Sequence, residues 1–145
     1  MKLNKNCIFL FLFCIVLYGA FLGTIPLLDP DEPVYGETAK EMIASGDFLS
    51  PRIYGEFWYD KPPLFYWLEA LSFSLFGVST WAARFPSLFL GALTPVYLYL
   101  SSRKLIGGKA ALRGAFICAT SLEIIVLARS SLPDSLHTLT LTIAH

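Results

Sequence analysis

The sequence has few charged residues and few cysteines, and charge of neither sign predominates. Only 15% of its 145 residues are charged, the formal net charge is zero, and 55% of the residues are hydrophobic. A neutral chain lacks the basic surface with which proteins bind nucleic acid, so we expect no nucleic-acid partner. A composition this apolar is unusual for a soluble domain and is typical of an integral membrane protein.

The three cysteines indicate neither a disulfide framework nor a metal site. Cys7, Cys14 and Cys118 lie within apolar runs, and none has a histidine at the spacing of zinc ligands. We interpret them as small hydrophobic residues inside helices. The chain also lacks internal repeats and low-complexity linkers. We therefore expect residues 1–145 to form a single transmembrane domain. Because the sequence stops inside an apolar run that starts at residue 136, we expect this domain to be a fragment of a longer protein.

Long apolar runs supply the candidate membrane spans. The first, residues 7–25, is about 28 Å long as a helix, which suits a hydrocarbon core of roughly 30 Å. Further apolar runs cover about residues 85–102 and 110–127, and a fourth starts at 136. The sequence therefore predicts an all-α polytopic membrane protein. A cleaved signal peptide is the alternative for residues 7–25, but the run is long for one and has no clear cleavage site.

The distribution of positive charge predicts how these spans are oriented. Two lysines precede the first run, which places the N-terminus in the cytoplasm. The apolar stretch 63–77 is only about 22 Å long as a helix and carries Glu69, so we expect an amphipathic helix on the membrane surface rather than a span. The basic cluster of residues 103–113 then falls in a cytoplasmic turn, and residues 29–84 form one outer loop.

The outer loop opens with an acidic stretch, DPDEPVYGETAKEM, at the end of the first apolar run. Pro33 suits the first turn of a helix, which Asp31 or Glu32 can cap, and Gly46 suits its end. Capping requires one carboxylate, whereas the stretch holds four within its first nine residues. Two interpretations stay open at this point, helix caps and a catalytic cluster.

A second pattern in the loop, FWYDKPPLFYW, places Asp60 and Lys61 before two prolines. The prolines stiffen the turn, so the lysine is held where it can bind a phosphate as a compact positive charge. A solvent-exposed ion pair between Asp60 and Lys61 is the alternative. The surrounding tryptophans and tyrosines suit either a membrane interface or contact with a sugar or polyprenyl chain.

Three polar residues in the last part of the chain complete the candidates. Glu123 interrupts the third apolar run, either as an intramembrane acid or as a residue near the outer end of that span. Asp134 follows the same span, so in this topology it emerges on the face that carries Asp31. His137 stands alone near a helix start, which is more typical of a surface or packing residue.

Four stretches of the sequence, taken in order, carry a resemblance to a known family. They are DPDEPVYGETAKEMIASGDFLSPR, YDKPPLFYWLEALSFSLFG, AARFPSLFLGALT and the S-x-x-D of residues 131–134. Together they resemble the N-terminal part of the protein O-mannosyltransferase and aminoarabinose (lipid A) transferase family of C-type membrane glycosyltransferases. The resemblance implies a multi-pass enzyme of the bacterial inner membrane. Such an enzyme moves a sugar from a polyprenyl-phosphate donor to a protein or lipid acceptor outside the cytoplasm.

The resemblance also implies roles for the outer carboxylates. Asp31 matches the family's catalytic acid/base, which takes a proton from the acceptor. Glu32 lies beside it in the same carboxylate motif, and Asp134 matches a second outer carboxylate near the reaction centre.

The same resemblance implies further roles, and the sequence differs from the family at one position. Lys61 and Tyr35 match residues that face the donor phosphate, and Asp60 matches an acid that contacts a bound divalent metal. Val34 departs from the family, in which arginine is common before this tyrosine. That departure keeps a catalytically inactive membrane remnant or scaffold subunit as the alternative function.

The topology predicts that Asp31 and Asp134 share the non-cytoplasmic side of the membrane. Cysteines introduced beside each should therefore react with a membrane-impermeant maleimide added from that side. A cysteine in the basic turn of residues 103–113 should be protected from the same reagent. Labelling of the two positions from opposite sides would show that the proposed reaction centre cannot assemble.

Overall fold

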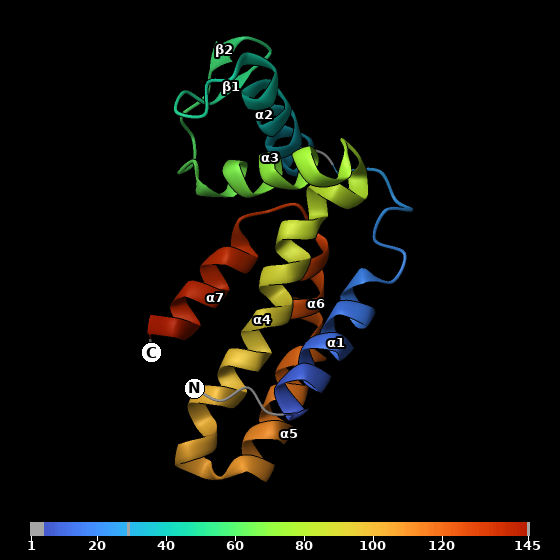
Figure 1. Cartoon of the computed structure of the whole chain (residues 1–145), viewed down its shortest axis with the longest axis vertical. Coiled ribbons are helices and arrows are strands. Elements are labelled where there is room, and N and C mark those ends of the chain that lie inside the picture. Colours follow the sequence, from blue (N-terminus) through green and yellow to red (C-terminus); the bar gives the residue numbers. More distant parts are fainter. Residues whose placement is uncertain (1–4, 29, 145) are drawn as a thin grey trace. The chain divides into compact units, whose positions relative to one another are not determined.

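The computed structural model describes residues 5–28 and 30–144, and it is all-helical apart from one small hairpin (Figure 1). The hairpin pairs β1 (Arg52–Ile53) with β2 (Glu56–Phe57). The helices are α1 (Lys5–Gly19), α2 (Asp31–Ser45), α3 (Leu64–Phe76), α4 (Thr80–Ile106), α5 (Gly108–Ala119), α6 (Leu122–Arg129) and α7 (Asp134–Ala144). The predicted all-α class is confirmed.

The chain divides into two compact units, which are described separately. The first contains α1, α5, α6, α7 and the part of α4 that starts at residue 87. The second contains residues 21–86, with α2, the hairpin, α3 and the start of α4, and also the short segment 130–133.

In the first unit, α6 packs against α1, α5 and α7. Phe13 of α1 meets Phe116 of α5 edge to face, with 5.3 Å between the ring centroids. The end of α1 is held by Arg129, whose Nη1 donates to the carbonyl oxygens of Tyr18 (2.7 Å) and Ala20 (2.8 Å). Carbonyls at the end of a helix have no partner within it, so the last residue of α6 supplies one.

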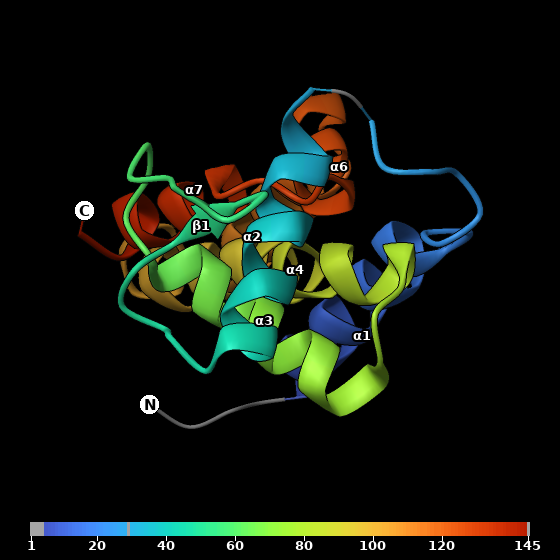
Figure 2. The ribbon, with the colours of Figure 1, turned by 90° about the horizontal axis from the view of Figure 1, so that it is seen from above.

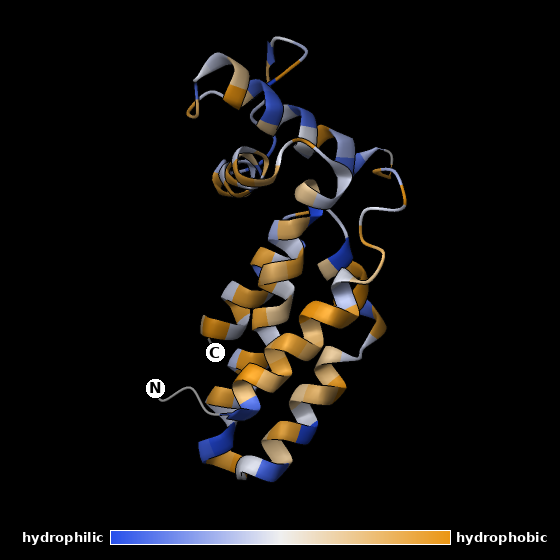
Figure 3. Cartoon of the chain, turned by 45° about the vertical axis from the view of Figure 1, so that its right-hand side comes forward, coloured by the Kyte–Doolittle hydropathy of each residue, from blue (hydrophilic) through white to orange (hydrophobic). Residues whose placement is uncertain are grey.

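The helices of the first unit are largely apolar, and hydrophilic residues gather at the turn between α4 and α5 (Figure 3). Across residues 5–28 and 30–144, none of the helices has both the length and the apolar composition to cross a bilayer by itself. α5 and α6 meet both conditions only when taken together, and the break between them bends the pair by 58°. The spans expected at 7–25, 85–102 and 110–127 and from 136 stay predictions.

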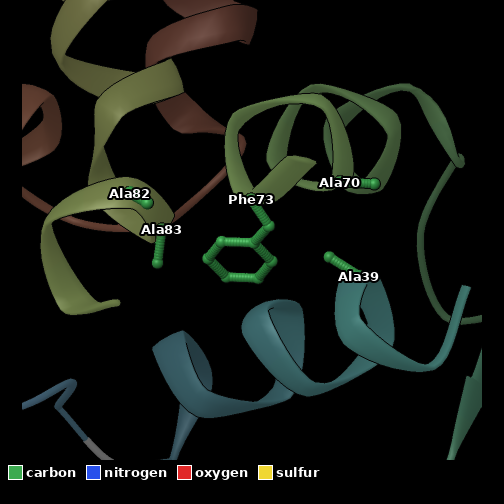
Figure 4. Packing of buried hydrophobic residues seen from close by; sticks show 5 residues of the cluster. All are labelled: Ala39, Ala70, Phe73, Ala82 and Ala83. Carbon is green, nitrogen blue, oxygen red and sulfur yellow. The ribbon is translucent and has the colours of Figure 1, made fainter. Parts of the chain in front are cut away.

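In the second unit, α2 lies against α3, and β1 lies beside α2 (Figure 2). Phe73 of α3 fills the space between the helices (Figure 4). Small side chains surround it, namely Ala39 of α2, Ala70 of α3, and Ala82 and Ala83 of α4, and all of them are buried. These alanines let the three helices approach closely around one aromatic ring.

Proline and glycine residues mark the helix ends that the sequence predicts in this unit. α3 lies between Pro63 and Gly77. α2 ends before Gly46, which adopts the left-handed conformation (φ 71°) and donates its N–H to the carbonyl of Met42. Because a residue with a Cβ rarely adopts this φ, the glycine fixes the end of α2.

The start of α2 differs from the prediction. One of the two interpretations left open by the sequence, that Asp31 or Glu32 caps the helix, is wrong. Pro30 occupies the cap position without a side-chain hydrogen bond, and both acids lie inside the first turn. Both are near the positive end of the helix dipole, so neither is unfavourable there.

The approach of α4 to α6 in the first unit predicts the effect of a methyl group at Gly91. A Cβ at this position would lie 2.5 Å from the Cβ of Ala128, so the two helices would have to separate. We expect Gly91→Ala to lower the free energy of unfolding by about 1–3 kcal/mol. Thermal unfolding of the detergent-solubilised protein, followed by tryptophan fluorescence, measures this.

Gly114 in α5 provides the matched control. A Cβ there meets no atom within 4 Å. Since alanine favours helix over glycine, Gly114→Ala should raise stability by up to about 1 kcal/mol. Equal stability of both variants and the parent would contradict the close approach at Gly91.

Candidate active site

A buried ion pair joins the start of α2 to the start of α4 in the second unit. Arg84 meets Glu32 through two hydrogen bonds, from Nε to Oε1 (2.9 Å) and from Nη2 to Oε2 (2.7 Å). Only 5% of the Arg84 side chain and 4% of the Glu32 side chain are exposed. This two-point geometry is the strongest form of ion pair between such groups.

The remaining N–H groups of Arg84 bind the chain that precedes α2. Nη1 donates to the carbonyl oxygens of Leu22 and Ile25, both at 2.9 Å, and Nη2 donates to that of Pro26 at 3.0 Å. An arginine has five N–H donors, and all five of Arg84 are used. One side chain of α4 therefore shapes the irregular connection that leads to α2.

Glu32 is equally well satisfied. Besides the two bonds from Arg84, its carboxylate accepts the backbone N–H of Leu28 (2.7 Å) and of Ser131 (2.6 Å). Burial would raise the pKa of Glu32, but the hydrogen bonds from Arg84 and from these two N–H groups outweigh it and lower the pKa. Glu32 is therefore a fixed carboxylate with all of its hydrogen-bonding capacity occupied.

A second acid, Glu69 of α3, lies in the same buried cluster. Its Oε1 is hydrogen-bonded to the hydroxyl of Ser131, which also lies 3.1 Å from the carbonyl oxygen of Ala83. Glu69 is fully buried, and its Oε2 has no hydrogen-bond partner in the part of the chain that the structure describes. Burial, together with the negative charge of Glu32, raises the pKa of Glu69 well above its usual value, against a smaller opposing effect of Ser131. We call Glu32, Glu69, Arg84 and Ser131 the polar cluster.

Asp31 differs from the adjacent Glu32 in its exposure and in its hydrogen bonding. It is the first residue of α2 and is exposed. Within the described part of the chain, its carboxylate has no ion pair and no hydrogen bond. Asp31 is therefore the acid of this motif that is free to bind a substrate or accept a proton. Asp29, the first acid of the stretch, lies outside the described residues.

The hydrogen bonds of Glu32 argue against the predicted catalytic role, which stays a prediction. A base needs a lone pair that a substrate proton can reach. All four hydrogen-bonding sites of the Glu32 carboxylate are taken and the side chain is buried, so we assign it to holding the fold of the site.

Tyr35 follows one turn after Asp31 and faces α3. Its ring lies 5.6 Å from the ring of Phe65 at 89°, and 5.6 Å from that of Tyr66 at 34°. Tyr35 is largely buried, and Tyr66 is completely so. Burial raises the pKa of Tyr66 to about 12, with a contribution from neighbouring Tyr35. The ring of Tyr35, for which a contact with the donor phosphate is predicted, is therefore packed in an aromatic cluster.

Asp60 and Lys61 lie in the exposed turn that precedes α3. Lys61 Nζ is 3.6 Å from Asp60 Oδ2, and the side chains are 47% and 55% exposed, respectively. This is the exposed ion pair that the sequence left as an alternative, and such a pair contributes little to stability. Lys61 is accessible to an anionic ligand.

The metal predicted at Asp60 does not fit the residues around it. In residues 5–28 and 30–144, no group of three or more His, Cys, Asp or Glu side chains could hold a metal ion. The nearest charged partner of Asp60 is the cation Lys61. We therefore derive no chemistry from a metal at this position.

The remaining candidates belong to the first unit. Asp134 is the first residue of α7 and is exposed, as is His137 one turn later. Glu123 lies in the first turn of α6, directly after the break that separates it from α5, and is also exposed. The predicted role of Asp134 stays a prediction.

Sequence reasoning missed three residues of the polar cluster as functional positions. Glu69 was noted only as an acid that disfavours a span, Arg84 only as the end of the loop, and Ser131 only as part of the S-x-x-D pattern. The available signal was a single charge in an apolar stretch, AARFPSLFL for Arg84 and FYWLEALSF for Glu69. Such a charge requires a buried partner, but the sequence does not say which one.

Comparison with known proteins defines the class of this chain. Residues 60–145 match the profile of the family described as dolichyl-phosphate-mannose-protein mannosyltransferase. The fold is similar to solved structures of ArnT from Cupriavidus metallidurans, in the apo state and bound to undecaprenyl phosphate. Each superimposes with a TM-score of 0.86 at 25% sequence identity, over 93% of this chain and 25% of the ArnT chain.

Curated relatives extend the match across the acidic stretch and its surroundings. A protein of Aquifex aeolicus (strain VF5) is 36% identical over 131 residues, which cover 90% of this chain and 26% of the relative. The undecaprenyl phosphate-alpha-4-amino-4-deoxy-L-arabinose arabinosyl transferase of Edwardsiella ictaluri (strain 93-146) is 32% identical over 119 residues, covering 81% of this chain and 22% of the relative. The chain thus spans about a quarter of the length of the relatives it matches.

The chain belongs to the protein mannosyltransferase and aminoarabinose transferase family. The resemblance inferred from its four sequence stretches is confirmed.

The ion pair of Arg84 and Glu32 generates a stability prediction. Removal of one partner leaves the other charge buried and unpaired, which costs about 3–5 kcal/mol. We therefore expect Arg84→Met to lower the unfolding midpoint strongly or to prevent folding, and Glu32→Gln to lower it as well. Thermal unfolding in detergent and protease resistance measure the effect.

The pair of Lys40 and Glu37 on α2 is the control for this experiment. Their Nζ and Oε2 atoms are also 2.7 Å apart, but the side chains are 44% and 32% exposed. Water screens such a pair, so Lys40→Met should change stability by no more than about 1 kcal/mol. Equal effects at Arg84 and Lys40 would contradict the importance of burial.

Proposed function

We propose that this chain forms part of a membrane glycosyltransferase that moves a sugar from a polyprenyl-phosphate donor to a protein or lipid acceptor. The proposal places the reaction on the non-cytoplasmic face of a bacterial inner membrane, with a multi-pass chain and a cytoplasmic N-terminus. Membership of the family supports it, as does the likeness to an ArnT structure that is bound to undecaprenyl phosphate. The observation that carries it is a contrast between two acids. Asp31 is exposed and has no ion pair or hydrogen bond within the described residues, whereas the carboxylate of Glu32 is fully hydrogen-bonded in the polar cluster.

The chemistry requires two groups of opposite charge. Attack of the acceptor on the anomeric carbon needs a base that takes a proton from the acceptor. Departure of the polyprenyl phosphate needs positive charge near the phosphate oxygens. In the proposal, Asp31 is the base and Lys61 supplies the charge. The acceptor attacks opposite to the leaving group, so the anomeric configuration inverts.

The surroundings of these two residues support this assignment. Asp31 is carried by the first turn of α2, whose backbone position is fixed by the bonds of the adjacent Glu32. Lys61 projects from a turn stiffened by two prolines directly before α3. Because α2 packs on α3, the base at the start of α2 and the cation in the turn before α3 belong to one unit. Tyr35 would support the donor phosphate, and Asp134 would serve as the second carboxylate.

A catalytically inactive scaffold is the alternative, and Val34 favours it. The chain resembles relatives in which arginine commonly precedes the tyrosine at this position. An apolar side chain removes one cation from the proposed phosphate site, which weakens donor binding. The polar cluster would be equally useful to a scaffold, so the two functions differ in the need for Asp31.

Replacement of Asp31 tests the proposed base. In the full-length protein, Asp31→Asn should lower sugar transfer from the lipid-linked donor by about 10²–10⁴-fold, the usual contribution of a general base. The amount of this variant in the membrane should stay unchanged, because the carboxylate is exposed and has no partner among residues 5–28 and 30–144. Transfer is measured in membrane vesicles with radiolabelled donor, and protein level by immunoblot.

Glu37→Gln is the matched control, since Glu37 is an acid on the same helix that pairs only with Lys40 in the described residues. It should leave transfer unchanged. Undiminished transfer by Asp31→Asn would show that Asp31 is not the base. Failure of this variant to accumulate in the membrane would assign Asp31 a role in folding.

A further inference from the structure

The polar cluster contains one more acid than it has cations. Glu32 and Glu69 are both buried, and Arg84 is the buried cation beside Glu32. Arg84 donates all five of its N–H groups to Glu32 and to three backbone carbonyls, so it has none left for Glu69. A second ionised carboxylate in this apolar environment would have no counter-charge, which is strongly unfavourable.

The hydrogen bonds of Ser131 indicate that Glu69 carries a proton and is therefore neutral. Its hydroxyl contacts two oxygens, Oε1 of Glu69 and the carbonyl oxygen of Ala83. A hydroxyl has a single hydrogen to donate, and a carbonyl oxygen accepts only. Both contacts are hydrogen bonds if Ser131 donates to Ala83 and accepts from Glu69. Glu69 must then carry the proton.

We propose that Glu69 is held as a neutral carboxylic acid that donates to Ser131, and that this bond, with the bond from the Ser131 N–H to Glu32, fixes segment 130–133 as a positioning element for Asp134. Asp134 follows this segment directly in the chain and begins α7. Glu69 and Ser131 are thus positioning residues, and their effect on sugar transfer rests on the proposed function.

The groups that act on Glu69 agree with its neutral state. Glu32, on α2, is ionised and raises the pKa of Glu69, and the charge of Arg84, on α4, is directed at Glu32. Tyr66, on α3 itself, is neutral because burial raises its pKa to about 12. No described charge therefore favours ionisation of Glu69, and burial opposes it.

This arrangement has a pH dependence of defined sign. The pKa of Glu69 in the folded chain lies above its value in the unfolded chain. Its contribution to stability is therefore complete below the unfolded pKa and is lost as the pH rises toward the folded pKa. An ionised Glu69 cannot donate, so Ser131 would turn its hydrogen from Ala83 to Glu69 and the segment would loosen.

Infrared spectroscopy of the membrane-reconstituted protein in D₂O tests the protonation state. The parent should show the C=O stretching band of a buried protonated carboxyl at neutral pH, and Glu69→Gln should remove it. Glu37→Gln, at a half-buried acid that is paired with Lys40, should leave the band unchanged. The absence of such a band in the parent, or its persistence in Glu69→Gln, would overturn the proposal.

Hydrogen exchange tests the anchoring of segment 130–133. Glu69→Gln keeps a donor toward Ser131, so exchange in this segment should stay slow and should no longer accelerate as the pH is raised. Ser131→Ala removes both hydroxyl contacts with little change in volume, and exchange should become about tenfold faster. Parent-like exchange in Ser131→Ala would contradict the anchoring.

Sugar transfer provides the readout for positioning. Transfer by the parent should fall at alkaline pH, Glu69→Gln should flatten that decline, and Ser131→Ala should lower transfer at every pH without loss of protein. Transfer by Ser131→Ala equal to that of the parent would overturn the positioning role. If the parent itself transfers no sugar, the proposed function fails, while the infrared and exchange results still decide the state of Glu69.

Discussion

A guanidinium buried in an apolar chain must have all five of its N–H groups bonded, and this requirement organises the second unit. Arg84 meets it by gathering groups that lie far from it in sequence, three carbonyls of the connection before α2 and the carboxylate of Glu32. A well-packed apolar substitute for such a pair is often as stable. What the pair provides here is a defined path for a loop that has no regular secondary structure.

The same pair explains how two adjacent acids come to serve different purposes. Successive residues of a helix point about 100° apart, so Asp31 is directed away from the cluster when Glu32 turns toward Arg84. The locked acid thereby fixes the backbone from which the free acid projects. A free carboxylate on a rigid turn is what a general base requires, because its position is set before substrate binds.

The sequence predicted those features of this unit that depend on local chemistry. Gly46 marks the end of α2, and Pro63 and Gly77 mark the ends of α3, because these residues act through their own backbone preferences. The start of α2 was mispredicted because two acids beside a proline suit a cap or a first turn equally well.

Features that depend on distant partners were beyond the sequence. The partner of Arg84 is 52 residues away, and Ser131 contacts Glu32 across 99 residues. The contact of Ser131 with Glu32 uses a backbone N–H, which every residue except proline has, so no residue pattern could reveal it. The break between α5 and α6 was missed for a related reason, because an apolar run has the same composition whether it is straight or bent by 58°.

Local structure also decides which of the two buried acids is ionised. Glu32 lies in the first turn of α2, near the positive end of the helix dipole, and it receives two backbone N–H groups in addition to Arg84. Glu69 lies in the middle of α3, where the backbone N–H groups are already bonded within the helix, and its contact in the described residues is with the hydroxyl of Ser131. A carboxylate is stabilised by several donors, whereas a carboxylic acid needs a single acceptor. The donors around each acid therefore assign the charge to Glu32 and the proton to Glu69.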